Sequence, residues 1–194
     1  MATEVEVKAW LPDYDAARAR VEAEAPLARE VTTRDLYYAP ARIPPHAVDL
    51  LRDPIFRLRH EGGDDWIVTV KAKSIDDGVE TNREVEFRVD DVASFREFAQ
   101  HVGFRPFIVK RKQSRRYAFG RATVELNRVD PLGDFMEIEI LLADDAPRDE
   151  VKSAEKEVRA LLSRFGVPEE KIEPRLYVDL IRARGGTGRP PGGV

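Results

Sequence analysis

Charged side chains recur at every second position in several stretches of the chain, beginning with "TEVEVKAW" near the N-terminus. An extended strand would place Glu4, Glu6 and Lys8 on one face and Val5 and Val7 on the other. Carboxylates on one face can hold a hard divalent cation, and lysine or arginine side chains can bind phosphate oxygens. The chemistry that such a face suggests is therefore phosphoryl or nucleotidyl transfer with Mg²⁺ or Mn²⁺.

The same alternation recurs along the chain. The further sets that share a strand face are Arg57 and Arg59; Lys71 and Lys73; Glu84, Glu86 and Arg88; Lys110 and Lys112; Glu125 and Asn127; and Glu137 and Glu139. A sheet with one face in water would explain any single strand. Solvated faces usually mix charged residues with Ser, Thr and Gln, whereas these are almost purely ionic. A closed barrel with the charges inside explains them jointly, if the cations meet a polyanion and the glutamates a metal ion.

The elements that position these residues can be predicted from the hydrophobic pattern and the turn residues. We expect strands at residues 3–10, 34–40, 55–60, 66–73, 81–89, 107–119, 121–129 and 134–142, and helices at 13–26, 90–104, 148–166 and 173–183. The order and the lack of a linker predict one α+β domain over residues 1–182, with a large, mostly antiparallel sheet. The Gly/Pro-rich residues 183–194 are expected to form a disordered tail.

Composition excludes several classes of protein. The 32 basic and 36 acidic residues nearly balance, which argues against a nucleic-acid or membrane-surface partner. The absence of cysteine excludes disulfides and thiolate metal sites, and the three histidines are too widely separated to favour a zinc site. No apolar run reaches the roughly 18 residues of a membrane span, and no signal peptide is visible, so we expect a cytoplasmic protein, either a monomer or a homodimer.

The charged motifs resemble the CYTH superfamily of triphosphate tunnel metalloenzymes. "EVEVK" is similar to the Glu-x-Glu-x-Lys signature on the first strand of that family. The resemblance continues in order through "FRLR", "TVKAK", "REVEF", "VGFRPFIVKRKQ", "DPLGDFMEIEI" and "EPRLYVDLI", over roughly residues 3–181. It implies an eight-stranded antiparallel β-barrel with helices packed outside. The C-terminal motifs are most similar to the class IV adenylyl cyclases, which make cyclic AMP and pyrophosphate from ATP.

The resemblance also implies residue roles. The metal-binding candidates are Glu4, Glu6, Glu84, Glu86, Glu137 and Glu139, which would hold Mg²⁺ or Mn²⁺. The substrate-binding candidates are Lys8, Arg57, Arg59, Lys71, Lys73, Lys110, Lys112 and Arg115. The catalytic candidates are Lys8, Lys71, Lys112 and Asn127. The expected ligand is a small-molecule triphosphate: ATP, inorganic triphosphate or thiamine triphosphate.

Two positions depart from the family pattern. Asn127 stands where an aspartate is usual, and Ser114 stands where an arginine commonly follows Lys112, although Arg115 and Arg116 lie close by. Because an amide adds no negative charge, these departures keep three hypotheses open: a cyclase, a triphosphatase of inorganic or thiamine triphosphate, and a non-catalytic binder of triphosphate or polyphosphate. Candidates to stack on a base are Tyr37, Tyr38, Trp66 and Phe107, although aromatic residues in strands more often belong to the core.

Overall fold

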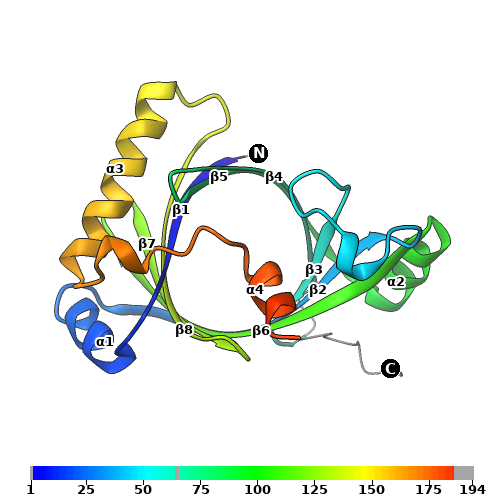
Figure 1. Ribbon diagram of the computed structural model, residues 1–194, viewed down its shortest axis with the longest axis horizontal. Coiled ribbons are helices and arrows are strands. Elements are labelled where there is room, and N and C mark those ends of the chain that lie inside the picture. The colour runs from blue at the N-terminus through cyan, green and yellow to red at the C-terminus, as the bar shows by residue number, and fades with distance from the viewer. Residues whose placement is uncertain (1, 64–65, 186–194) are drawn as a thin grey trace.

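A computed structural model describes residues 2–63 and 66–185. Within them, eight antiparallel strands close into one barrel, in the order β1-β5-β4-β3-β2-β6-β7-β8 (Figure 1). The strands are β1 (Ala2–Trp10), β2 (Leu27–Pro40), β3 (Phe56–His60), β4 (Trp66–Asp76), β5 (Val79–Val89), β6 (Phe104–Phe119), β7 (Ala122–Asp130) and β8 (Gly133–Ala143). The helices are α1 (Tyr14–Glu22), α2 (Val92–His101), α3 (Arg148–Arg164) and α4 (Tyr177–Ala183), with short 3-10 turns η1 (Pro45–Ala47) and η2 (Glu169–Lys171). The predicted fold class is confirmed.

Several strands are longer than the sequence predicts, and two of these extensions bear on the barrel wall. β2 begins at Leu27 rather than residue 34, because its first half pairs with the second half of β6, where Val31 lies opposite Ser114. β5 begins at Val79 rather than residue 81, and this extension adds Glu80 to the barrel wall. Both extensions depend on pairing with strands distant in sequence, which local patterns do not encode.

The apolar strand faces turn outward, and much of their surface packs under helices, although Val70, Val85 and Phe87 of β4 and β5 stay exposed. Val5 and Val7 of β1 are fully buried in a core that includes Ala17 of α1 and Val158 of α3. α2 covers another side of the barrel, where its Ala99 belongs to a second core with residues of β2, β3, β4 and β6. Because side chains alternate along a strand, burying these residues outside directs their charged neighbours into the barrel.

The last helix takes a different place, at one end of the barrel, whereas α1, α2 and α3 pack on its outside (Figure 1). Arg182 of α4 donates to the carbonyls of Val48 and Pro45, both at 2.9 Å, and Phe135 of β8 packs edge-on against the Tyr177 ring. These contacts anchor α4 across the opening. Within the described residues, no helix is both long enough and apolar enough to span a bilayer.

The predicted domain limit at residue 182 falls within α4, near its end. Most of the predicted tail, residues 186–194, lies outside the described residues.

Candidate active site

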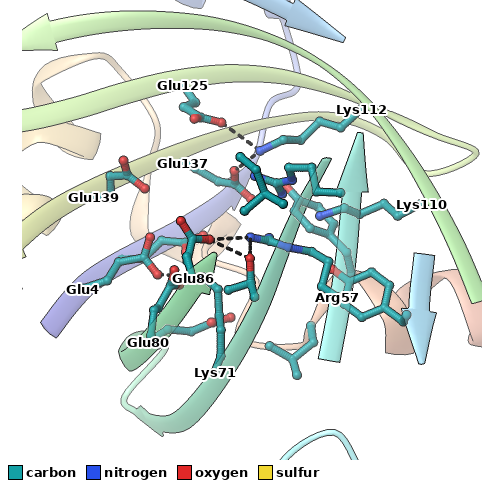
Figure 2. Close-up of a pocket in the computed structure, with 18 of the residues that line it drawn as sticks. Glu4, Arg57, Lys71, Glu80, Glu86, Lys110, Lys112, Glu125, Glu137 and Glu139 are labelled. Carbon is teal, nitrogen blue, oxygen red and sulfur yellow. Dashed lines mark hydrogen bonds and ion pairs between the residues drawn. The ribbon is translucent and has the colours of Figure 1, made fainter. Parts of the chain in front are cut away.

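A cavity of about 450 Å³ lies inside the barrel and is lined by charged side chains (Figure 2). The predicted site residues that line it are Glu4, Glu6, Lys8, Arg57, Arg59, Lys71, Glu84, Glu86, Lys110, Lys112, Glu137 and Glu139. Other charged residues that line it are Arg29, Glu61, Glu80, Arg88, Arg116 and Glu125. The closed barrel therefore gathers most of the predicted residues around one space.

Arg115 is the exception among the predicted substrate-binding residues. It lies on the outer face of β6, where it contacts Glu22 and Glu30 and donates to the Tyr117 hydroxyl at 3.0 Å. The prediction that Arg115 joins Lys112 in the site is not met, since residues an odd number apart in a strand face opposite sides. Arg116, an even number of residues from Lys112, lines the cavity instead. The Lys73 side chain lies outside the described part of the structure.

Opposite charges occupy different sides of the cavity. Figure 2 shows Glu4, Glu80 and Glu139 on one side and Lys110 and Lys112 on the other. The strand register explains the acidic side, because Glu6 of β1 lies directly opposite Glu80 of β5 and Glu139 of β8. Carboxylates thus predominate on one side of the cavity and basic groups on the other, although Lys8 and Lys71 lie among the glutamates.

Two lysines bridge acidic residues in this arrangement. Lys112 Nζ lies 2.8 Å from carboxylate oxygens of both Glu125 and Glu137, and Lys71 Nζ lies 2.8 Å from Glu4 and also contacts Glu84. Burial alone would raise the pKa of Glu137, but Lys112 and Lys110 outweigh it and lower the pKa to about 2. Burial likewise opposes the ionisation of Glu4, but Lys71 holds its pKa well below the usual range.

Other carboxyl groups of the cavity are shifted in the opposite direction. Burial, together with the charges of Glu137, Glu80 and Glu4, raises the pKa of Glu6 well above its usual value. Burial and the neighbouring Glu4 raise the pKa of Glu139 to about 8. Glu6 has no hydrogen-bond or ion-pair partner among the described residues. This side of the cavity therefore holds more carboxyl groups than its lysines neutralise.

The carboxyl groups fit a hard divalent cation by their chemistry, since Mg²⁺ and Mn²⁺ prefer oxygen ligands and would relieve the crowding around Glu6. The donors are not already arranged as a finished site: no three acidic or histidine side chains in the described residues converge on one point. Instead, Lys71 and Lys112 hold Glu4 and Glu137.

Asp35 is a site residue that the sequence analysis missed. It is fully buried in β2, directly opposite Arg59 of β3 and Lys110 of β6. Arg59 donates to both carboxylate oxygens, at 2.8 and 3.0 Å, and Lys110 Nζ lies 3.0 Å away. Burial opposes its ionisation, yet Arg59 and Lys110 hold its pKa well below the usual range. Asp35 therefore fixes two of the cavity's cations.

Tyr177 was also missed, because a residue at the start of a helix shows no strand alternation. Its ring lies 4.6 Å from Lys8 Nζ and 5.0 Å from Lys110 Nζ, so it packs between two of the cavity's lysines. Lys8 also donates to the carbonyl of Arg175, at 2.6 Å. Burial and the nearby Glu137 raise the pKa of Tyr177 well above its usual value, so the phenol keeps its proton.

The aromatic residues proposed to stack on a base are mostly placed elsewhere. Tyr38 stacks on Phe56 in the outer core, Trp66 packs against His60, and Phe107 lies in the core around α4. Of the four candidates, Tyr37 alone lines the cavity.

Arg57 reaches the cavity from β3 and is held less tightly than Arg59. It donates to the Thr69 hydroxyl at 2.9 Å, and Thr69 donates to Glu86 at 2.6 Å. Asn127, by contrast, is fully buried on the inner face of β7, between Ser114 and Glu137, and does not line the cavity.

Comparison with known proteins shows which sequences and structures this chain resembles. The sequence profile described as the CYTH domain matches residues 2–177. A "Putative adenylate cyclase" of Methanocaldococcus jannaschii is 27% identical over 128 residues, which are 66% of this chain and 71% of that protein.

Two solved structures extend the comparison. The PH1012 protein of Pyrococcus horikoshii has a TM-score of 0.75 and 26% identity, covering 91% of this chain and 98% of its own. A Hippeastrum protein, described as a "Putative adenylyl cyclase" with a dominant triphosphatase activity, has a TM-score of 0.63 and 16% identity, covering 95% and 96%. The latter likeness is one of fold.

Proposed function

Since the chain belongs to the CYTH domain family, we propose that it is a metal-dependent enzyme that acts on a triphosphate inside the barrel. The observation that carries this proposal is the division of the cavity into a carboxylate side and a lysine–arginine side. A triphosphate bound to Mg²⁺ or Mn²⁺ has the same two parts, an anionic phosphate chain and a divalent cation.

The basic residues would bind and orient the phosphate chain. Arg57, Arg59, Lys110 and Lys112 supply donors to phosphate oxygens, while Asp35 keeps Arg59 and Lys110 in position. The same donors would stabilise the negative charge that builds on the leaving pyrophosphate or phosphate. The α4 helix, with Tyr177 facing the cavity, limits the access of water from its end of the barrel.

The carboxylates would hold the divalent ion. We assign Glu4, Glu6 and Glu137 to this role, with Glu84, Glu86 and Glu139 around them. When bound, the ion neutralises phosphate charge and polarises a phosphate oxygen. Lys71 and Lys112, which neutralise Glu4 and Glu137 in the ligand-free arrangement, would then be available to the phosphates.

Cyclisation of ATP to cyclic AMP and pyrophosphate is the reaction that we favour. The ribose 3′-hydroxyl would attack the α-phosphorus and give up its proton to solvent, and the bond from the α-phosphorus to the bridging oxygen would break to release pyrophosphate. The adenylate cyclase name of the M. jannaschii relative supports this choice. A triphosphatase is the second candidate. Of the four residues proposed to stack on a base, Tyr37 alone lines the cavity, so there is little support for an adenine-binding site, which a triphosphatase of inorganic triphosphate does not need.

Product analysis would test these alternatives. The protein would be incubated with ATP, inorganic triphosphate or thiamine triphosphate, with Mg²⁺ or Mn²⁺, and the products separated by anion-exchange chromatography. Cyclic AMP and pyrophosphate in equal amounts would support the cyclase. Release of phosphate without cyclic AMP would support the triphosphatase. Binding of triphosphate by calorimetry without any product would contradict an enzymatic role and leave a non-catalytic binder.

A further inference from the structure

Two neutral residues lie beside Glu137 on the inner faces of β6 and β7, next to the cavity but not among the residues that line it. Ser114 of β6 and Asn127 of β7 are direct partners in the strand register, and both are buried, with 3% and 0% of their surface exposed. The Ser114 hydroxyl donates to Asn127 Oδ1 at 2.5 Å, and Asn127 Nδ2 donates to Glu137 Oε2 at 2.7 Å. The three side chains therefore form one directed chain of hydrogen bonds.

The direction of this chain is fixed by chemistry. A reversed amide would place Asn127 Oδ1 against the Glu137 carboxylate, where neither group has a proton to donate. Glu137 therefore fixes the orientation of the amide, and the Ser114 hydroxyl, which can donate or accept, must donate its proton to Oδ1. Both polar atoms of the Asn127 amide are thereby engaged, and its oxygen is directed to Ser114 rather than to a ligand in the cavity.

Asn127 and Lys112 act on the same oxygen of Glu137. Lys112 Nζ lies 2.8 Å from Oε2, the oxygen that Asn127 also contacts. Lys112 is on a flexible side chain and carries a charge that a phosphate would attract, whereas the Asn127 amide is held by Ser114 and is neutral. Asn127 can thus keep Glu137 oriented after Lys112 moves, without repelling a cation.

We propose that Ser114 and Asn127 form a positioning pair that orients Glu137 for a divalent cation, and that Asn127 is not itself a ligand of that cation. This inference rests on the proposed function, in which Glu137 binds the ion. Residues that hydrogen-bond to metal ligands commonly change metal affinity by roughly 10–100-fold when they are replaced.

The test measures the binding of Mn²⁺ alone to the substrate-free protein, by the electron paramagnetic resonance signal of unbound Mn²⁺. The variants are Ser114→Ala, Ser114→Thr, Asn127→Leu and the double variant of Ser114→Ala with Asn127→Leu. Circular dichroism and thermal unfolding establish that each variant is folded. Should Ser114→Ala fail to fold, Ser114→Cys replaces it, since a thiol keeps the volume but is a weak donor.

We expect Ser114→Ala to weaken Mn²⁺ binding about 10-fold, although Ser114 does not touch Glu137, and Ser114→Thr to retain affinity because it keeps the hydroxyl. The double variant should bind as Asn127→Leu does, because the serine acts only through the amide. Unchanged Mn²⁺ affinity in Ser114→Ala, or additive losses in the double variant, would contradict the positioning role of Ser114 and Asn127.

The outcome for the wild type separates this role from the proposed function. If the wild type binds no Mn²⁺, both the metal dependence and the positioning role are wrong. If the wild type binds Mn²⁺ and Ser114→Ala binds it equally well, the positioning role alone is wrong.

Discussion

Individual carboxyl groups of the cavity contribute to stability with opposite signs. Burial opposes the ionisation of Glu137, but Lys112 and Lys110 outweigh it and lower the pKa of Glu137 to about 2. A lowered pKa stabilises the fold above the unfolded-state pKa. Glu6 is buried among other carboxylates, and its pKa is raised, so its ionisation is less favourable in the folded chain than in the unfolded one. This difference costs stability, and the cost grows as the pH rises from the unfolded-state pKa toward the folded one.

Replacing each of these glutamates by glutamine should therefore change the melting temperature in opposite directions. In EDTA at pH 7, Glu6→Gln should raise Tm because a neutral amide removes an ionisable group from among buried carboxylates, and Glu137→Gln should lower Tm because Lys112 loses a partner. For a chain of this length 1 kcal/mol corresponds to about 2–4 °C. Both variants should lose turnover with Mg²⁺ or Mn²⁺. Shifts in the same direction, measured by calorimetry, would contradict the assigned electrostatics.

Asp35 should be a stability residue as well as a positioning residue. Asp35→Asn leaves Arg59 and Lys110 buried without their carboxylate, and loss of one partner from a buried ion pair costs about 3–5 kcal/mol. Because the folded pKa of Asp35 is depressed, the difference from wild type should be full from about pH 8 to pH 5 and shrink as the pH falls further toward the folded pKa.

Urea unfolding at pH 7, pH 5 and pH 3 measures this difference. Asp144→Asn is the matched control, because Asp144 forms a bidentate pair with Arg83 on the surface, where loss of the pair should change little. If Asp35→Asn and Asp144→Asn were equally stable at pH 7, the ion pairs of Asp35 with Arg59 and Lys110 would not stabilise the fold.

At the level of elements, strand alternation predicts many of the residues that enter the barrel. Glu4, Glu6 and Lys8 of β1 share a face in the sequence and line one cavity in the structure. The same rule assigns Arg115 to the outside of β6, and the sequence prediction failed there because it followed nearness in sequence rather than strand parity.

Other site residues could not be predicted for physical reasons. Glu80 was missed because β5 is extended by its pairing with β1, a partner distant in sequence. Tyr177 enters the cavity through the docking of a helix, which has no local signature. Asp35 did leave a signal: it is a lone carboxylate in the otherwise apolar stretch "DLYYA" of a predicted strand, and an unpaired charge there demands partners.

The two faces of β6 provide a matched test of the barrel. Lys112→Met should weaken the binding of inorganic triphosphate at least 10-fold, because a charge-assisted hydrogen bond contributes about 1.5–3 kcal/mol. Arg115→Met removes the same charge three residues away but from the outer face, and should leave affinity within about 2-fold. Isothermal titration calorimetry with Mg²⁺ present measures both. Equal losses in the two variants would mean that net charge, rather than the cavity, governs binding.

In the molecule as a whole, the closed barrel joins the ligand site to the stability of the fold. The charged residues of the cavity come from strands on every side of the ring, including β1, β3, β4, β6 and β8. A bound triphosphate would therefore contact strands that are not neighbours in the sheet. Each strand pairs with two others in the closed barrel. Separating any two paired strands would therefore also move cavity residues away from a bound ligand.

Inorganic triphosphate with Mg²⁺ should accordingly raise the melting temperature of the entire barrel in one transition. A ligand at 100 times its Kd stabilises a protein by about 2.7 kcal/mol, which for this chain length corresponds to about 5–10 °C. Differential scanning calorimetry would compare triphosphate with orthophosphate at equal ionic strength, and wild type with Lys112→Met. Orthophosphate should shift Tm less, since it spans fewer of the cations, and Lys112→Met should lose most of the triphosphate shift. An equal shift with both anions, or a shift that survives in Lys112→Met, would place the binding of triphosphate on the outer surface of the barrel rather than inside it.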